Sequence, residues 1–189
     1  MKQITLLLFV VSTMVGAIVP LVPAFGQANL EADPVYGIKF PAGYRDWGMI
    51  SAAQVGAPVS DIRVKLGNDI AMMAFRDDKR PFPDGTIIAR LAYRQVTSEE
   101  NNKVFRAAAE RLGQPPEQIE KLLAGSFVAG PPTNVQFMVK DSKKYASSGG
   151  WGFAQFTNGK PDGEAVQKTC FACHQPAKDH DFVFTRYAP

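Results

Sequence analysis

The chain has 189 residues, of which 46% are apolar and 21% charged, and its formal net charge at pH 7 is +3. This composition is ordinary for a folded protein, and the length suits one domain with a substantial core rather than two. The basic residues are dispersed along the chain, so the charge pattern does not favour a nucleic acid as partner.

Residues 1–28 have the pattern of a secretory signal peptide. Lys2 precedes a nearly uncharged apolar stretch, and small residues follow it. An uncleaved membrane anchor is the alternative, because the apolar stretch approaches the length that spans a bilayer. Gly16 and Pro20 weaken such a helix, so we expect cleavage after residue 28. The mature protein would then be a single periplasmic domain at 29–189.

Strand and helix patterns are interspersed through this domain. Between residues 61 and 66, apolar side chains alternate with Arg63 and Lys65, which predicts a strand. Capping residues at Thr97 and Ser98 open a helical insert at 97–125, to which the sequence assigns no role. The connections are too varied for regular βαβ units, so we predict an α+β fold, a mainly antiparallel β-sheet with flanking helices. The predicted elements are a short helix after Pro41, a strand at 61–66, a helix at 69–76 capped by Asn68, a strand at 86–96, helices at 99–112 and 116–124, strands at 134–140 and 151–156, a helix at 164–173 and a short strand at 181–185.

The only two cysteines of the chain lie in the sequence Cys170-Phe171-Ala172-Cys173-His174, which is the C-x-x-C-H pattern of covalent haem attachment. Two thiols one helical turn apart can each add to a haem vinyl group, and His174 then presents its imidazole to the iron. A redox-active cysteine pair and a zinc site that includes His180 are the alternatives. The first expects a thioredoxin-like βαβ context, and the second would need adjacent residues to ligate one tetrahedral ion. We therefore predict one covalently attached haem c in the C-terminal helix.

The ligand opposite His174 decides which function such a haem supports. His180 follows only six residues later and is expected to remain on the same side of the haem. A methionine thioether would give a Met/His electron carrier, although methionines at helical spacing more often fill a core. We expect an open iron position that binds small ligands. The methionines considered are Met49, Met72, Met73 and Met138.

From residue 44 onward, the order of short motifs resembles the cytochrome P-460 family, which includes the cytochrome c′-beta proteins. The resemblance implies an antiparallel β domain with flanking helices, a homodimer, and a five-coordinate c-haem held by the proximal histidine. Members of the family oxidise hydroxylamine or bind nitric oxide and related ligands. The matching segments are 44–47, 61–64, 82–86, 139–143, 151–153, the haem motif and 181–186.

Two positions depart from the hydroxylamine-oxidising members of that family. The resemblance places Arg90 where those members link a lysine to the porphyrin, and a guanidinium is a poor nucleophile because it stays protonated. It places Gln136 where they have a glutamate, and an amide cannot take a proton near pH 7. Arg63 matches an arginine close to the haem, so Arg63, Arg90 and Gln136 are our candidates for the ligand side of the pocket. The predicted aromatic walls of the haem site are Phe82, Trp151 and Phe153.

The resulting functional prediction is a periplasmic c-type cytochrome that binds nitric oxide or a similar nitrogen-oxide or diatomic ligand. It would also transfer electrons to an unidentified periplasmic redox partner. Two alternatives remain open. One is a hydroxylamine-oxidising enzyme of the same family, and the other is an electron carrier with Met/His ligation.

Overall fold

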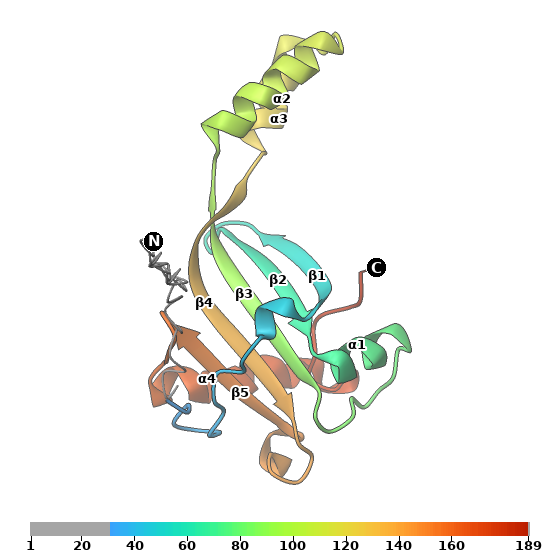
Figure 1. Cartoon of the computed structure of the whole chain (residues 1–189), viewed down its shortest axis with the longest axis vertical. Coiled ribbons are helices and arrows are strands. Elements are labelled where there is room, and N and C mark those ends of the chain that lie inside the picture. The colour runs from blue at the N-terminus through green and yellow to red at the C-terminus, as the bar shows by residue number, and fades with distance from the viewer. Residues whose placement is uncertain (1–30, 189) are drawn as a thin grey trace, which may run out of the picture.

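The structure is a computed structural model that describes residues 31–188, so the predicted signal peptide lies outside the described residues. At its centre is one six-stranded antiparallel sheet, in which neighbouring strands follow one another along the chain (Figure 1). Together with its helices, the sheet confirms the predicted α+β fold. The strands are β1 (Gly48–Val55), β2 (Asp61–Gly67), β3 (Ile87–Val96), β4 (Val128–Lys140), β5 (Trp151–Thr157) and β6 (Lys160–Pro161).

Side-chain caps begin two of the helices. Asn68 accepts a hydrogen bond from the backbone N–H of Ala71 at 3.0 Å, which confirms the predicted cap. In the predicted capping segment of the insert, Ser98 accepts from the N–H of Asn101 at 3.3 Å. Within residues 31–188, no helix has the length and apolar character needed to cross a bilayer. The helices are α1 (Asp69–Arg76), α2 (Glu99–Arg111), α3 (Pro116–Ala124) and α4 (Glu164–His174), with short 3-10 helices η1 (Tyr44–Asp46), η2 (Ala146–Ser148) and η3 (Gln175–His180).

Four strands differ from the sequence prediction, and one of them is β6, whose two residues are too few to give a recognisable pattern. β1 was not predicted, because it is rich in small residues and lacks a clear alternation. β4 begins at Val128 rather than at residue 134. Prolines near its start are unusual in a strand, so the sequence did not predict this part. The pairing of β4 with β3 shifts register around Tyr93. The predicted strand at 181–185 is wrong. Asp181 and Phe182 have φ values of 52° and 63°, so the chain turns there instead of extending along a neighbour.

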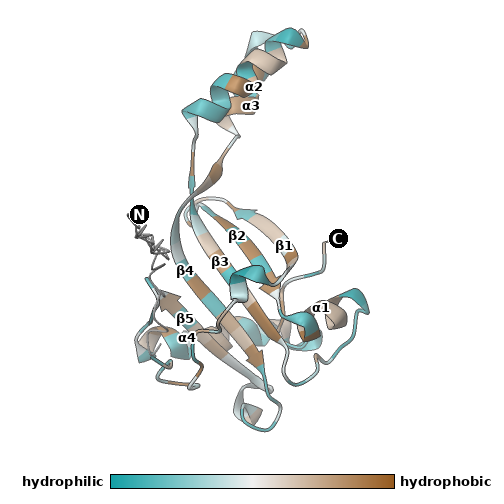
Figure 2. Cartoon of the chain, in the orientation of Figure 1, coloured by the Kyte–Doolittle hydropathy of each residue, from teal (hydrophilic) through white to brown (hydrophobic). Residues whose placement is uncertain are grey.

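Both faces of the sheet are covered. On one face, side chains such as Leu91 and Phe137 pack against the N-terminal segment around Tyr44. On the other face, alternate residues of the same strands meet α1, the haem-motif helix α4 and the C-terminal segment, with Trp151 and Phe153 in the core. Figure 2 shows the resulting bands of hydrophobic and hydrophilic residues along the central strands. Polar side chains of the central strands also lie on this second face, opposite the C-terminal segment.

Helices α2 and α3 form a hairpin that projects from the ends of β3 and β4, away from the sheet (Figure 1). The hairpin corresponds to the predicted helical insert. Its own core is small and consists of Ala109, Ile119 and Leu123. An ion pair between Arg106 and Glu120 links the two helices. The two helices are thus held together by contacts of their own, beyond the sheet.

Gly149 allows the loop before β5 to approach the C-terminal segment closely. It has a φ of +70°, and a Cβ placed on it would lie 2.1 Å from the Phe182 ring. We expect Gly149→Ala to lower the melting temperature of the holoprotein clearly more than Gly159→Ala. Gly159 also has a positive φ, +76°, but a Cβ placed on it would have no atom within 4 Å, so this variant reports only the backbone cost of about 1 kcal/mol. Equal melting temperatures for the two variants would contradict this.

Candidate haem site

The cysteines of the haem motif lie in the last turns of α4, and this helix is anchored to β5 by Gln167. The Gln167 side chain is fully buried, and its Oε1 accepts the backbone N–H of Gln155 at 2.9 Å. Its Nε2 donates to the backbone carbonyl of Gln155, also at 2.9 Å. Cys170 is partly buried, which raises the pKa of its thiol, whereas Cys173 is exposed, and neither forms a disulfide. Both sulfurs thus remain free for attachment on a helix with a fixed position.

His174 ends α4 with its imidazole held in one orientation. Its Nδ1 lies 2.7 Å from the carbonyl oxygen of Phe182, so the neutral ring donates its Nδ1 proton there and leaves Nε2 free as a metal ligand. The ring lies between Phe153 and Phe184, with centroid distances of 4.9 and 5.0 Å. Burial lowers the pKa of His174, which favours the neutral form that binds iron.

Two adjoining cavities meet at His174. The larger, about 570 Å³, lies against β1 to β4 and is closed on its other side by the C-terminal segment. The smaller, about 140 Å³, lies against β4 and β5 and is lined by both cysteines. Gln136, Met138 and His174 line both cavities. The attachment sulfurs, the iron-binding imidazole and the sheet therefore border two neighbouring cavities that share three lining residues.

The structure brings most of the predicted site residues together. Arg63, Arg90 and Gln136 line the larger cavity, and Phe153 lines the smaller one. Phe82 and Trp151 line neither; their rings pack against each other in the core, with centroids 5.7 Å apart. The structure thus places these two aromatic residues behind the site rather than at its wall.

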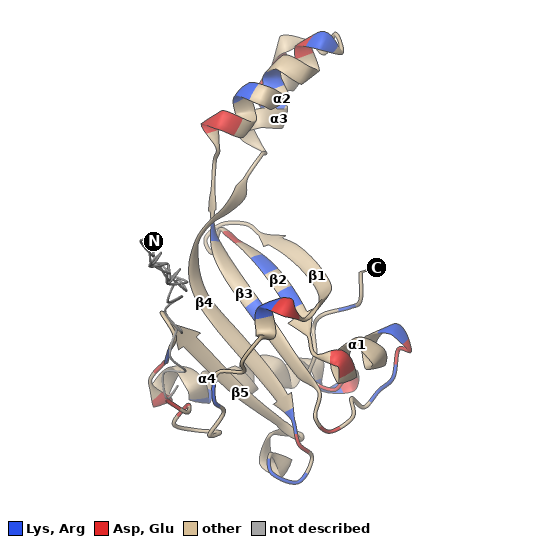
Figure 3. Ribbon diagram, viewed as in Figure 1, with Lys and Arg blue, Asp and Glu red and all other residues tan. Residues whose placement is uncertain are grey.

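Sequence reasoning missed Lys65, which also lines the larger cavity. It lies directly opposite Arg90 in the pairing of β2 with β3, and basic residues gather on these two strands (Figure 3). Burial first, and then the charges of Arg63 and Arg90, lower the pKa of Lys65. The signal was present in the alternation of β2, because Arg63 and Lys65 necessarily share one face of the strand.

Arg90 is the most buried of these cations. Burial, together with the like charge of Arg63, lowers the pKa of Arg90 to about 10. Its Nη2 donates to Oδ1 of Asn134 at 2.8 Å, but its buried Nε has no hydrogen-bond partner among the described residues. Arg63 is paired with Asp61 at 2.9 Å. The cavity therefore presents more positive charge than Asp61, which lies outside its lining, can balance.

These features fit a haem. A porphyrin brings two propionate carboxylates, which would offset the positive charge of Arg63 and Lys65 and leave Arg90 for the ligand. The larger cavity is about 570 Å³, and known cofactor pockets span about 300–1,000 Å³. Cys170 and Cys173 would hold the macrocycle at the β4–β5 side, and His174 would ligate its iron.

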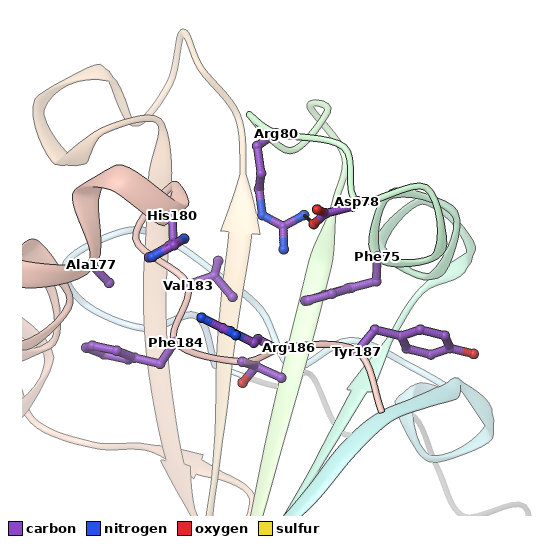
Figure 4. A pocket seen from close by; sticks show the side chains of 10 residues that line it. Phe75, Asp78, Arg80, Ala177, His180, Val183, Phe184, Arg186 and Tyr187 are labelled. Carbon is purple, nitrogen blue, oxygen red and sulfur yellow. Dashed lines mark ion pairs between the residues drawn. The ribbon is translucent and has the colours of Figure 1, made fainter. Parts of the chain in front are cut away.

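The other proposed iron ligands are distributed unevenly. Met138 lines both cavities beside His174, whereas Met72 is buried in the core and Met49 and Met73 are largely exposed. His180 instead lines a third cavity of about 680 Å³, which shares only the C-terminal residues 183–186 with the larger haem-site cavity (Figure 4). Across residues 31–188, no group of three or more His, Cys, Asp or Glu side chains is arranged to hold a metal ion. The alternative zinc cluster is therefore not formed in the described part of the chain.

Comparison with known proteins agrees with this site. The sequence model of the family described as Cytochrome P460 matches residues 41–185, which covers β1 to β6, α4 and most of the C-terminal segment. No curated protein sequence matches the chain. The family implies a haem cofactor, and the match includes every residue that surrounds the two cavities except Arg186. The chain therefore belongs to the cytochrome P460 family of haem proteins.

Proposed function

We propose that this protein is an exported mono-haem c-type cytochrome that binds nitric oxide or a similar small ligand. Cys170 and Cys173 attach the haem, and His174 ligates its iron through Nε2. When bound, the haem supplies an iron with one position open to a small ligand. The hydrogen bond from His174 to the Phe182 carbonyl supports this role, because it fixes both the tautomer and the direction of the imidazole.

The observation that carries the ligand-binding proposal is the unpartnered Nε of Arg90. A buried donor without a partner is costly, so the Arg90 side chain, which lines the larger cavity, would gain from a small shift that brings its guanidinium to an acceptor atom of a bound ligand. A guanidinium beside a ligand that gains negative charge would also stabilise that charge. A pKa of about 10 leaves Arg90 protonated at neutral pH, so it acts as a donor and not as a base.

The same chemistry argues against hydroxylamine oxidation as the main activity. Among the described residues, no carboxylate lines either cavity, and Gln136 cannot accept a proton near pH 7. The electron-carrier alternative rests on Met138, whose thioether is the one methionine sulfur that lines the cavities in residues 31–188. Ligation by Met138 would close the position that the proposal leaves open.

Absorption spectroscopy of the purified holoprotein tests the proposal. We expect the reduced protein to show a five-coordinate high-spin spectrum that changes when nitric oxide is added. A low-spin spectrum that does not respond to nitric oxide would overturn the proposal and favour Met138 ligation. A broad, red-shifted Soret band would instead indicate a modified porphyrin and favour the oxidising enzyme.

Arg90→Leu should weaken retention of the ligand. Removing a charged donor is expected to raise the dissociation rate of nitric oxide about tenfold, as judged from the usual strength of such hydrogen bonds. Stopped-flow displacement of nitric oxide from the reduced protein measures this rate. Arg94→Leu is the matched control, because Arg94 lies on the same strand but is exposed and lines neither cavity. Equal rates for the two variants would contradict a role for Arg90.

Export, dimerisation and electron transfer complete the proposal. The N-terminal pattern supports cleavage after residue 28 and a periplasmic location. The homodimer is proposed from the family resemblance, and electrons would pass to an unidentified periplasmic redox partner. N-terminal sequencing of the periplasmic protein and its mass in solution test the first two points. A mature chain that begins with Met1, or a monomer at micromolar concentration, would overturn them.

A further inference from the structure

A chain of three polar side chains leads from the cavity to the edge of the sheet. Gln136 on β4 lies directly opposite Gln155 on β5, and its Nε2 donates to Oε1 of Gln155. Nε2 of Gln155 in turn donates to Oδ2 of Asp162, which follows β6. Gln136 lines both cavities, whereas Asp162 lines neither. The chain thus connects the haem cavity with a carboxylate outside it.

The direction of the hydrogen bonds from Gln136 through Gln155 to Asp162 is fixed by the carboxylate of Asp162. A carboxylate oxygen accepts hydrogen bonds, so Gln155 must turn its NH₂ group toward Asp162. Its carbonyl oxygen then faces Gln136, which must donate its own NH₂ group. Among residues 31–188, no hydrogen bond uses Oε1 of Gln136. We infer that Asp162, acting through Gln155, orients the Gln136 amide so that it offers the cavity a hydrogen-bond acceptor.

The middle of the chain is held in place by the helix that carries the haem motif. Gln167 bonds both the backbone N–H and the backbone carbonyl of Gln155. Gln155 therefore cannot shift along its strand without breaking these two hydrogen bonds. Asp162 also anchors itself, because its backbone N–H donates to the carbonyl of Gln155 at 2.9 Å. Asp162 and Gln155 are positioning residues in a rigid frame.

This orientation specifies a class of ligand, and that consequence rests on the proposed open iron position. Oε1 of Gln136 favours a small ligand that carries an N–H or O–H group, whereas a ligand such as nitric oxide, whose outer atom has only lone pairs, would be held by Arg90 instead. Arg90 offers a hydrogen-bond donor. It lies on the neighbouring strand β3, directly opposite Gln136. The cavity is therefore two-sided, with a donor on β3 and an acceptor on β4.

Asp162→Asn tests the role of the outer carboxylate. Asparagine can donate as well as accept, so both directions of the chain become possible. We expect hydroxylamine to bind the oxidised holoprotein about three- to tenfold more weakly, as the loss of one hydrogen bond implies. The carbon monoxide adduct of the reduced protein should gain a C–O stretching band at lower frequency, because a donor now faces the ligand. Asp179→Asn removes an exposed carboxylate from η3 and should change neither measurement.

A second variant at residue 162 should reverse the direction of both side-chain hydrogen bonds that link it to Gln136. In Asp162→Lys, the ammonium group must donate, so both amides turn over and the lower C–O band should become the main one. Gln136→Leu removes the amide through which we infer that Asp162 acts on the ligand. When Gln136→Leu is combined with Asp162→Asn, the second substitution should have no further effect on the C–O band. An additional shift in the double variant would show that Asp162 acts by another route and would overturn the inference.

Neutron crystallography of the deuterated holoprotein reads the orientation directly, whether or not the iron binds a ligand. Deuterium on the Gln136 nitrogen that points to Gln155, with the oxygen toward the cavity, is the expected result. The reverse arrangement overturns the inference. If the wild-type protein binds no carbon monoxide, the proposed open iron position fails, and the neutron result still decides the orientation of Gln136.

Discussion

Replacing both Cys170 and Cys173 by serine is expected to abolish covalent attachment of haem. Both thiols lie on α4 and line the same small cavity, and serine cannot form a thioether. Haem staining of the protein after denaturing electrophoresis should fall from a strong signal to background. Any haem that remains should be released by acidified acetone. The effect should be complete, because these are the only cysteines of the chain.

Single variants and a neighbouring substitution provide the controls. Cys170→Ser and Cys173→Ser each leave one thiol, so each should retain part of the attached haem. Thr169→Ser keeps a hydroxyl at the position before the motif and should give full attachment. Haem that resists extraction from the double variant would contradict attachment through sulfur alone. It would also contradict the prediction that no lysine cross-link forms, since such a bond would survive the loss of both thiols.

Lys140→Met is expected to lower the free energy of unfolding by about 3–5 kcal/mol, because it leaves a buried carboxylate without its partner. Nζ of Lys140 lies 2.7 Å from Oδ1 of Asp181, and the two side chains are only 6% and 10% exposed. The ammonium also lies over the Trp151 ring, 4.9 Å from its centroid. Urea denaturation of the holoprotein, followed by circular dichroism, measures the change.

The control for this prediction is Lys143→Met, which removes an exposed lysine of the next loop and should change stability by less than about 0.5 kcal/mol. Adding Asp181→Asn to Lys140→Met removes the unpaired carboxylate charge and should restore part of the lost free energy of unfolding. Oδ2 of Asp181 accepts the backbone N–H of Phe82 at 2.7 Å, so an asparagine oxygen can keep that bond. A Lys140→Met protein as stable as wild type would show that the ion pair contributes little.

This ion pair also matters for the haem site. Asp181 immediately precedes Phe182, whose carbonyl oxygen orients His174. We therefore expect Lys140→Met to perturb the spectrum of the bound haem as well as stability.

Local patterns in the sequence predicted much of the fold and the centre of the site. The cysteine and histidine spacing identified α4, and the alternation from residue 61 to 66 identified β2. That alternation did not reveal which face of β2 would meet solvent. In a sheet covered on both sides, charged residues such as Lys65 can face a cavity. For this reason Lys65 was missed, although its position in the strand was right.

Other features depend on contacts between segments far apart in the chain. The turn at Asp181 replaces the predicted strand because its carboxylate is bound by Lys140, which is 41 residues earlier. The bond between His174 and Phe182 depends on that turn. The chain from Gln136 to Asp162 needs the pairing of β4 with β5, and no property of the separate glutamines predicts it. Phe82 and Trp151 were placed at the haem wall because aromatic residues are common in both cores and pockets.

The order of strands in the sheet has a consequence for biosynthesis. Each strand pairs with the one made just before it, although β3 and β4 pair across the α2–α3 hairpin. Protein chains are made from the N-terminus. All six strands therefore leave the ribosome before α4 with its two thiols. The haem attachment motif is thus among the last parts of the chain to be made, after every strand of the sheet that borders its cavities.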